Sequence, residues 1–93
     1  MMREKIEELL WSKGLTPNYR GFLYLTDILE LAGQGRPIDR NMLSAVAQAH
    51  GVTPPSVHQA VTLALQCMDL PRTFPGPSKE WLYQKINFLY RQL

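Results

Sequence analysis

Apolar residues recur at intervals of three and four in five segments of the chain, and glycine or proline separates each segment from the next. The clearest example covers residues 57–68, where the apolar positions follow intervals of 3, 1, 3, 1 and 3. This spacing lays one continuous stripe along a helix of 3.6 residues per turn. No segment shows the sustained alternation of a half-buried strand. The sequence therefore predicts an all-α fold.

The composition agrees with this prediction. Leucine supplies 14 residues, whereas the β-branched valine and isoleucine together supply eight, and this excess favours helices over strands. With 93 residues, 45% of them apolar, the chain has enough hydrophobic side chains for one core and too few for two. We expect one compact domain of five to six helices over residues 1–93, with a helix-turn-helix at about 40–69 and a C-terminal helix at about 79–92.

Three polar residues predict where helices begin. Asp39 precedes the third apolar stripe, and its carboxylate is suited to accept a hydrogen bond from a free amide of the first turn. Thr53 precedes two prolines, which are well placed in a first turn because they lack amides that would need partners. Ser78 opens the last helix, after a proline-rich surface connection at residues 70–77.

The segment from residue 42 to residue 65 has the layout of a helix-turn-helix. A small residue, Ala47, lets one helix pass close to the next, and Gly51 four residues later accepts the positive φ that a short turn requires. Val57 and Ala60 then point back between the two helices. In such a unit the N-terminal turns of the second helix enter the DNA major groove, so its outward side chains are the candidate base readers.

The candidate DNA contacts divide by chemistry. Gln59 has the amide geometry that pairs with adenine, while Ser56, His58 and Thr62 have the polar groups to reach bases or phosphates. Arginines that flank the unit supply phosphate contacts, and the free amides of the helix start favour a phosphate nearby. The predicted DNA-binding set is Arg20, Arg40, Thr53, Pro55, Ser56, His58, Gln59 and Thr62.

The distribution of charge favours a second interpretation. Residues 41–68 include no Asp, Glu, Lys or Arg, and the net charge of the chain is only +2. Lysine and arginine supply most of the nonspecific affinity of a protein for DNA, so an uncharged reading helix binds weakly. The alternative to a small DNA-binding transcriptional regulator is therefore a protein-interaction module of the same fold that has lost strong DNA binding.

The last helix carries more aromatic residues than one core-facing stripe needs. Leu82, Ile86 and Leu89 form that stripe, and four aromatic residues extend the apolar surface around the helix. A peripheral helix that is apolar on several sides meets either the core or a partner. We expect a homodimer, with an interface that includes Trp81, Tyr83, Phe88 and Tyr90.

Other chemistry is not indicated. Cys67 is the single cysteine, which excludes an intramolecular disulfide, and neither it nor His50 and His58 have zinc-ligand spacing. Asp27 and Glu30 are expected on a solvated helix face, and His50 at a helix C-terminus in a structural role. We expect no metal, no cofactor, no small-molecule substrate and no enzymatic activity. Without a leader-like or membrane-spanning run, the chain is expected to be cytoplasmic, with no membrane partner.

Two motifs resemble one bacterial family. Residues 20–25 carry a basic-Gly-aromatic-x-Tyr-Leu motif, residues 53–61 read Thr-x-x-x-Val-x-x-Ala-aliphatic, and residues 78–82 match more loosely. Together they resemble the C-terminal effector domain of the master regulator of sporulation initiation in endospore-forming bacteria, over residues 5–89. The resemblance implies a six-helix domain with a central helix-turn-helix that binds double-stranded DNA, pairs with a second copy on tandem sites and regulates transcription.

Overall fold

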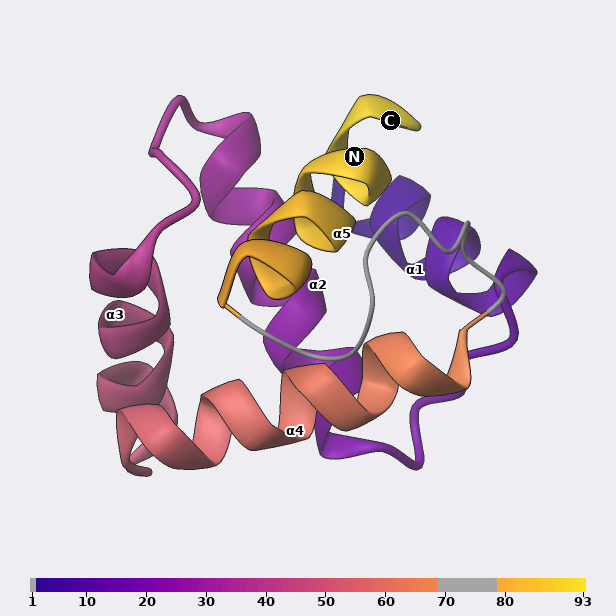
Figure 1. The fold of residues 1–93 in the computed structure, drawn as a ribbon. Helices are drawn as coiled ribbons and strands as arrows, with labels where there is room; N and C mark the ends of the chain where they lie inside the picture. The colour runs from indigo at the N-terminus through magenta and orange to yellow at the C-terminus, as the bar shows by residue number, and fades with distance from the viewer. Residues whose placement is uncertain (1, 69–78) are drawn as a thin grey trace.

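Helix α2 lies at the centre of the fold. The computed structural model describes residues 2–68 and 79–93, and within them the chain forms five helices and no strand (Figure 1). The helices are α1 (Met2–Ser12), α2 (Arg20–Gly33), α3 (Arg40–His50), α4 (Pro54–Cys67) and α5 (Lys79–Arg91). The structure is compact and 76% helical, which confirms the predicted all-α class. The predictions for Ser78 and for the connection at 70–77 lie outside the described residues.

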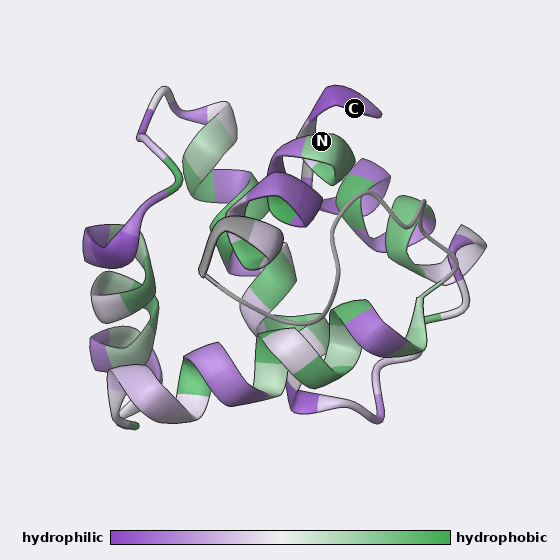
Figure 2. Cartoon of the chain, viewed as in Figure 1, coloured by the Kyte–Doolittle hydropathy of each residue, from purple (hydrophilic) through white to green (hydrophobic). Residues whose placement is uncertain are grey.

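The core is built around α2, which packs against all four other helices. In Figure 1, α4 crosses the N-terminal end of α2, and α1 and α3 lie on opposite sides of it. Fully buried side chains from each helix meet there, among them Ile6, Leu25, Val46, Val57 and Ile86. Figure 2 shows polar residues on the outer side of α3 and hydrophobic residues on the side that faces the rest of the domain. The apolar stripes of the sequence thus face a common centre.

The ends of α3 and α4 follow the predicted signals. The Asp39 carboxylate accepts a hydrogen bond from the Met42 amide at 3.1 Å, which caps α3. At its other end Gly51 adopts φ 67° and ψ 30°, and the Val52 amide donates to the Ala47 carbonyl at 3.0 Å. This is the Schellman arrangement, in which a left-handed residue reverses the chain. It joins α3 to α4 through residues 51–53 only.

The closest approach of two helices occurs between α2 and α4. A Cβ atom built at Gly21 would lie 2.4 Å from the Ala64 Cβ and 2.6 Å from the Ala60 carbonyl oxygen. Both distances are shorter than van der Waals contact, so the missing side chain at Gly21 permits the crossing. Gly21 therefore sets the separation between the central helix and α4.

Helix α5 uses one face for the core. Leu82, Ile86 and Leu89 are fully buried, as the sequence predicts. Trp81 is also in the core, with 8% of its surface exposed. Part of the aromatic surplus of this helix therefore serves folding. No helix among the described residues is both long enough and apolar enough to span a bilayer.

Candidate nucleic-acid interface

The start of α4 is an exposed helix end with a fixed cap. The Thr53 hydroxyl oxygen accepts a hydrogen bond from the Ser56 amide at 3.4 Å and lies 2.9 Å from the Ser56 hydroxyl. Pro54 and Pro55 occupy the first two helical positions. All four of these residues are exposed. The cap therefore presents hydroxyl groups and proline rings to solvent at the N-terminal end of α4.

Packing determines which side of α4 faces outward. Val57, Val61, Ala64 and Leu65 are buried, and α4 contacts α2, α3 and α5. This buried side leaves Gln59 exposed on the other side. The face expected to carry the base readers is thus the free face of the helix.

Two of the predicted readers are less accessible than the sequence suggests. His58 and Thr62 are only half-exposed. The Thr62 hydroxyl donates to the His58 carbonyl at 2.7 Å, so its hydrogen is already used within α4. Thr62 can therefore accept a hydrogen bond from a ligand but has no free donor while this bond persists. Ser56 and Gln59 remain the best-placed polar side chains.

The two predicted phosphate-binding arginines lie at helix starts. Arg20 is the first residue of α2 and precedes Gly21, the point where α2 meets α4. Arg40 is the first residue of α3 and lines a hollow together with Pro55 and His58. Both arginines are exposed. The structure thus places Arg20 next to the residue of α2 that packs closest to α4, and Arg40 on the hollow that the first turns of α4 border.

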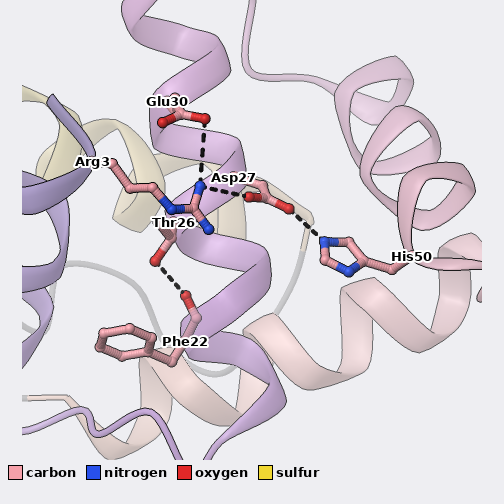
Figure 3. A network of polar contacts seen from close by, with 6 residues as sticks. All are labelled: Arg3, Phe22, Thr26, Asp27, Glu30 and His50. Carbon is pink, nitrogen blue, oxygen red and sulfur yellow. Dashed lines mark hydrogen bonds and ion pairs between the residues drawn. The ribbon is translucent and has the colours of Figure 1, made fainter. Parts of the chain in front are cut away.

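A polar network joins α1, α2 and α3 (Figure 3). Asp27 of α2 accepts hydrogen bonds from Nε2 of His50 and, at 3.2 Å, from Nη1 of Arg3. The same Arg3 nitrogen lies 3.4 Å from the Glu30 carboxylate. The hydrogen bond to Asp27 raises the pKa of the Arg3 guanidinium, with smaller contributions from nearby carboxylates. The sequence suggested that Asp27 and Glu30 form a solvated face of the helix. In the structure both carboxylates instead bind Arg3.

This network fixes the last residue of α3. The His50 ring also meets the Tyr24 ring edge-on, with centroids 5.1 Å apart. His50 immediately precedes Gly51, so contacts that hold its ring also hold the end of α3 from which α4 departs. The structural role expected for His50 has its physical basis in these two contacts with α2.

We expect the Asp27→Ala variant to lose about 1 to 2 kcal/mol of unfolding free energy, because His50 loses its carboxylate acceptor and Arg3 loses the nearer of its two carboxylate partners. Urea unfolding followed by circular dichroism measures this change. The matched control is Glu8→Ala, which removes an exposed carboxylate of α1 and should change stability by less than about 0.5 kcal/mol. Equal stabilities of the two variants would contradict a stabilising role for the network.

The four residues of the predicted dimer interface differ in how far they are buried. Trp81 is buried and offers little surface to a partner, whereas Tyr83, Phe88 and Tyr90 are half-buried. Among the described residues the large hydrophobic side chains with most exposure lie elsewhere, at Trp11, Tyr19, Leu23 and Leu63. The aromatic pattern of α5 could not separate core from surface, because a ring that reaches the core and one that reaches a partner have the same spacing.

Comparison of the chain with protein-family models, curated proteins and solved structures finds no match. The likeness to the sporulation effector domain therefore rests on the motifs at residues 20–25 and 53–61. Within the described part of the chain, no group of three or more His, Cys, Asp or Glu side chains could hold a metal ion. The arrangement that remains is a capped, outward-facing helix start, with exposed Arg40 on the hollow beside it and exposed Arg20 at the crossing of α2 and α4.

Proposed function

We propose that the protein is a small sequence-specific DNA-binding regulator of transcription, with α4 as the helix that enters the major groove. The observation that carries this proposal is the exposed start of α4, where the cap and Gln59 present polar groups outward while the opposite face is buried. The short turn at residues 51–53 and the resemblance to the sporulation effector domain give further support.

The proposed division of labour follows the chemistry of the side chains. Gln59 and Ser56 read base edges, since an amide can pair bidentately with adenine and a hydroxyl can donate or accept. Arg20 and Arg40 attract phosphates without reading sequence. With no charged residue between 41 and 68, affinity depends on these flanking arginines and falls steeply with salt.

The Gln59→Ala variant is expected to lose about 1 to 3 kcal/mol of binding free energy on the preferred site and little on other sequences. Arg40→Ala is expected to weaken binding to all sequences. It should also reduce the slope of the logarithm of the binding constant against the logarithm of the salt concentration by about one. The preferred site comes from titration against mixed genomic fragments at low salt, followed by sequencing of the retained DNA. Binding that stays undetectable at about 50 mM salt with micromolar protein contradicts the proposal, since electrostatic attraction is strong there.

A protein-interaction module is the second candidate function. Leu63 of α4 favours it, because 54% of this leucine is exposed near the proposed reading face. The uncharged stretch of residues 41–68 also suits a protein partner better than a polyanion. Absence of DNA binding in the titration above, in a folded sample, would favour this candidate over the first.

Homodimerisation is expected to double the number of phosphate contacts and so raise avidity. Sedimentation equilibrium at about 100 μM should then show a dimer for the wild-type chain, a concentration at which weak interfaces assemble. Phe88→Glu should shift the population toward monomer, whereas Gln48→Glu adds the same charge at an exposed position of α3, outside the predicted interface, and should not. A wild-type chain that remains monomeric contradicts the dimer.

A further inference from the structure

An open hollow lies between α3, the start of α4 and α5. Its volume is about 380 Å³. It is lined by Arg40, Leu43, Pro54, Pro55, His58 and Tyr83. Small-molecule sites in proteins have volumes on the order of 300 to 1,000 Å³, so this hollow is large enough for a small ligand. Three separate helices contribute to it, and the short turn at residues 51–53 fixes two of them relative to each other.

Among the described residues, the lining combines an apolar surface with one formal cation. Leu43, the two prolines and the Tyr83 ring supply the apolar part. Arg40 supplies the positive charge, and His58 and the Tyr83 hydroxyl are further hydrogen-bonding groups. The described residues that line the hollow include no Asp or Glu. Charge complementarity therefore favours a ligand with an apolar body and one negative group that binds the guanidinium.

The size of the hollow favours a small molecule over a protein partner. A stable protein interface buries about 800 Å² on each partner and involves about 20 residues a side. Six of the residues that the structure describes line the hollow, far fewer than such an interface involves. A planar carboxylate matches the paired donors of an arginine side chain in both geometry and charge.

We infer that this hollow binds a small apolar carboxylate, whose carboxylate group pairs with Arg40 and whose hydrocarbon body lies against Leu43, Pro55 and Tyr83. The chemical class is an aromatic or branched monocarboxylic acid. The site itself needs no DNA and can be tested on the isolated chain.

Three probes separate the contributions of charge and apolar body. Phenylacetate carries both features, phenylacetamide is its neutral counterpart, and acetate lacks the ring. In a nuclear magnetic resonance titration of the ¹⁵N-labelled protein, phenylacetate should give saturable shifts at the amides of Leu43, His58 and Tyr83. A dissociation constant on the order of 1 mM or below is expected for a ligand of this size. Phenylacetamide and acetate should bind at least about tenfold more weakly.

Two variants test the role of the cation. Arg40→Gln should reduce phenylacetate binding to the level of phenylacetamide, because the charge that distinguishes the two probes is gone. Arg36→Gln removes an exposed arginine outside the lining and should leave binding unchanged. The inference is overturned if phenylacetate does not saturate in the millimolar range, if acid and amide bind equally, or if acetate alone binds as well as phenylacetate.

A regulatory consequence follows if the proposed function holds. The hollow shares Arg40, Pro55 and His58 with the predicted DNA contacts, so a bound carboxylate competes with phosphate for the same cation. Phenylacetate should then weaken retention of DNA by the wild-type chain. DNA retention that is insensitive to phenylacetate at saturation overturns this competition. Failure of DNA binding itself leaves the titration without DNA as the test of the carboxylate site, so the two failures are distinguishable.

Discussion

The Gly21→Ala variant is expected to have an unfolding free energy about 3 kcal/mol below that of the wild-type chain, at the upper end of the usual range for overpacking. The added methyl group would lie 2.4 Å from the Ala64 Cβ and 2.6 Å from the Ala60 carbonyl oxygen. A flexible side chain could move aside, but a backbone carbonyl within a helix cannot. Helices α2 and α4 must therefore separate, which loosens the core along their whole contact. Urea denaturation followed by circular dichroism measures the loss.

A matched variant and a double variant sharpen this prediction. Gly33→Ala adds the same methyl group to the exposed last residue of α2 and should change stability by no more than about 1 kcal/mol. Adding Ala64→Gly to Gly21→Ala removes the first obstacle and leaves the Ala60 carbonyl in place, so it should restore only part of the loss. If Gly21→Ala were as stable as Gly33→Ala, this result would contradict the close crossing of α2 and α4.

The second large effect on stability is expected for an aspartate on the buried side of α4, in contrast to an aspartate on its exposed side. Val57 is fully buried, so Val57→Asp places an unpaired carboxylate in the core and should cost about 4 kcal/mol or more. That loss is a large fraction of the total stability of a small domain, and the variant should be largely unfolded. Gln59→Asp lies two residues away on the exposed side and should leave stability within about 0.5 kcal/mol of wild type.

The same pair of variants tests the proposed reading face. If Gln59 meets DNA, the aspartate at this position repels the phosphate backbone and retention should fall at least about tenfold in a folded protein. Thermal melts followed by circular dichroism establish the fold of each variant before DNA is added. Unchanged DNA retention by folded Gln59→Asp would contradict the assignment of α4, and unfolding of this variant would contradict its outward orientation.

Local signals in the sequence were sufficient for the helices and for the orientation of α4. The caps at Asp39 and Thr53 and the left-handed turn at Gly51 depend on residues within a few positions of one another, so their chemistry can be read along the chain. The apolar stripe of residues 57–68 likewise predicted the buried side of α4, including Val57 and Val61. The exposed positions of Ser56 and Gln59 follow from that stripe.

Contacts between distant residues could not be predicted in this way. The pair Asp27 and His50 is separated by 23 residues, and nothing in either local sequence indicates the other. Lys85 is another example, since only 4% of it is exposed although a lysine in a helix is usually assigned to the surface.

The hollow was also beyond sequence analysis, because its lining comes from three helices. Arg40 and Tyr83 were assigned to different surfaces, one to DNA and the other to a dimer, yet both border the same space. Periodicity shows which side of a helix faces inward. It does not show which residues of different helices line the same hollow.

Because α2 lies at the centre of the fold, the parts of the chain differ in how many substitutions they tolerate. The buried residues of α2 pack against four neighbouring helices, and at Gly21 even one methyl group has no room. The outer side of α4 has no such neighbours at Ser56 and Gln59, where side chains of many sizes fit without disturbing the core. Mutational drift can therefore exchange the chemistry of that outer side repeatedly while the scaffold stays the same, so close relatives of this chain can share its architecture and differ in what they bind.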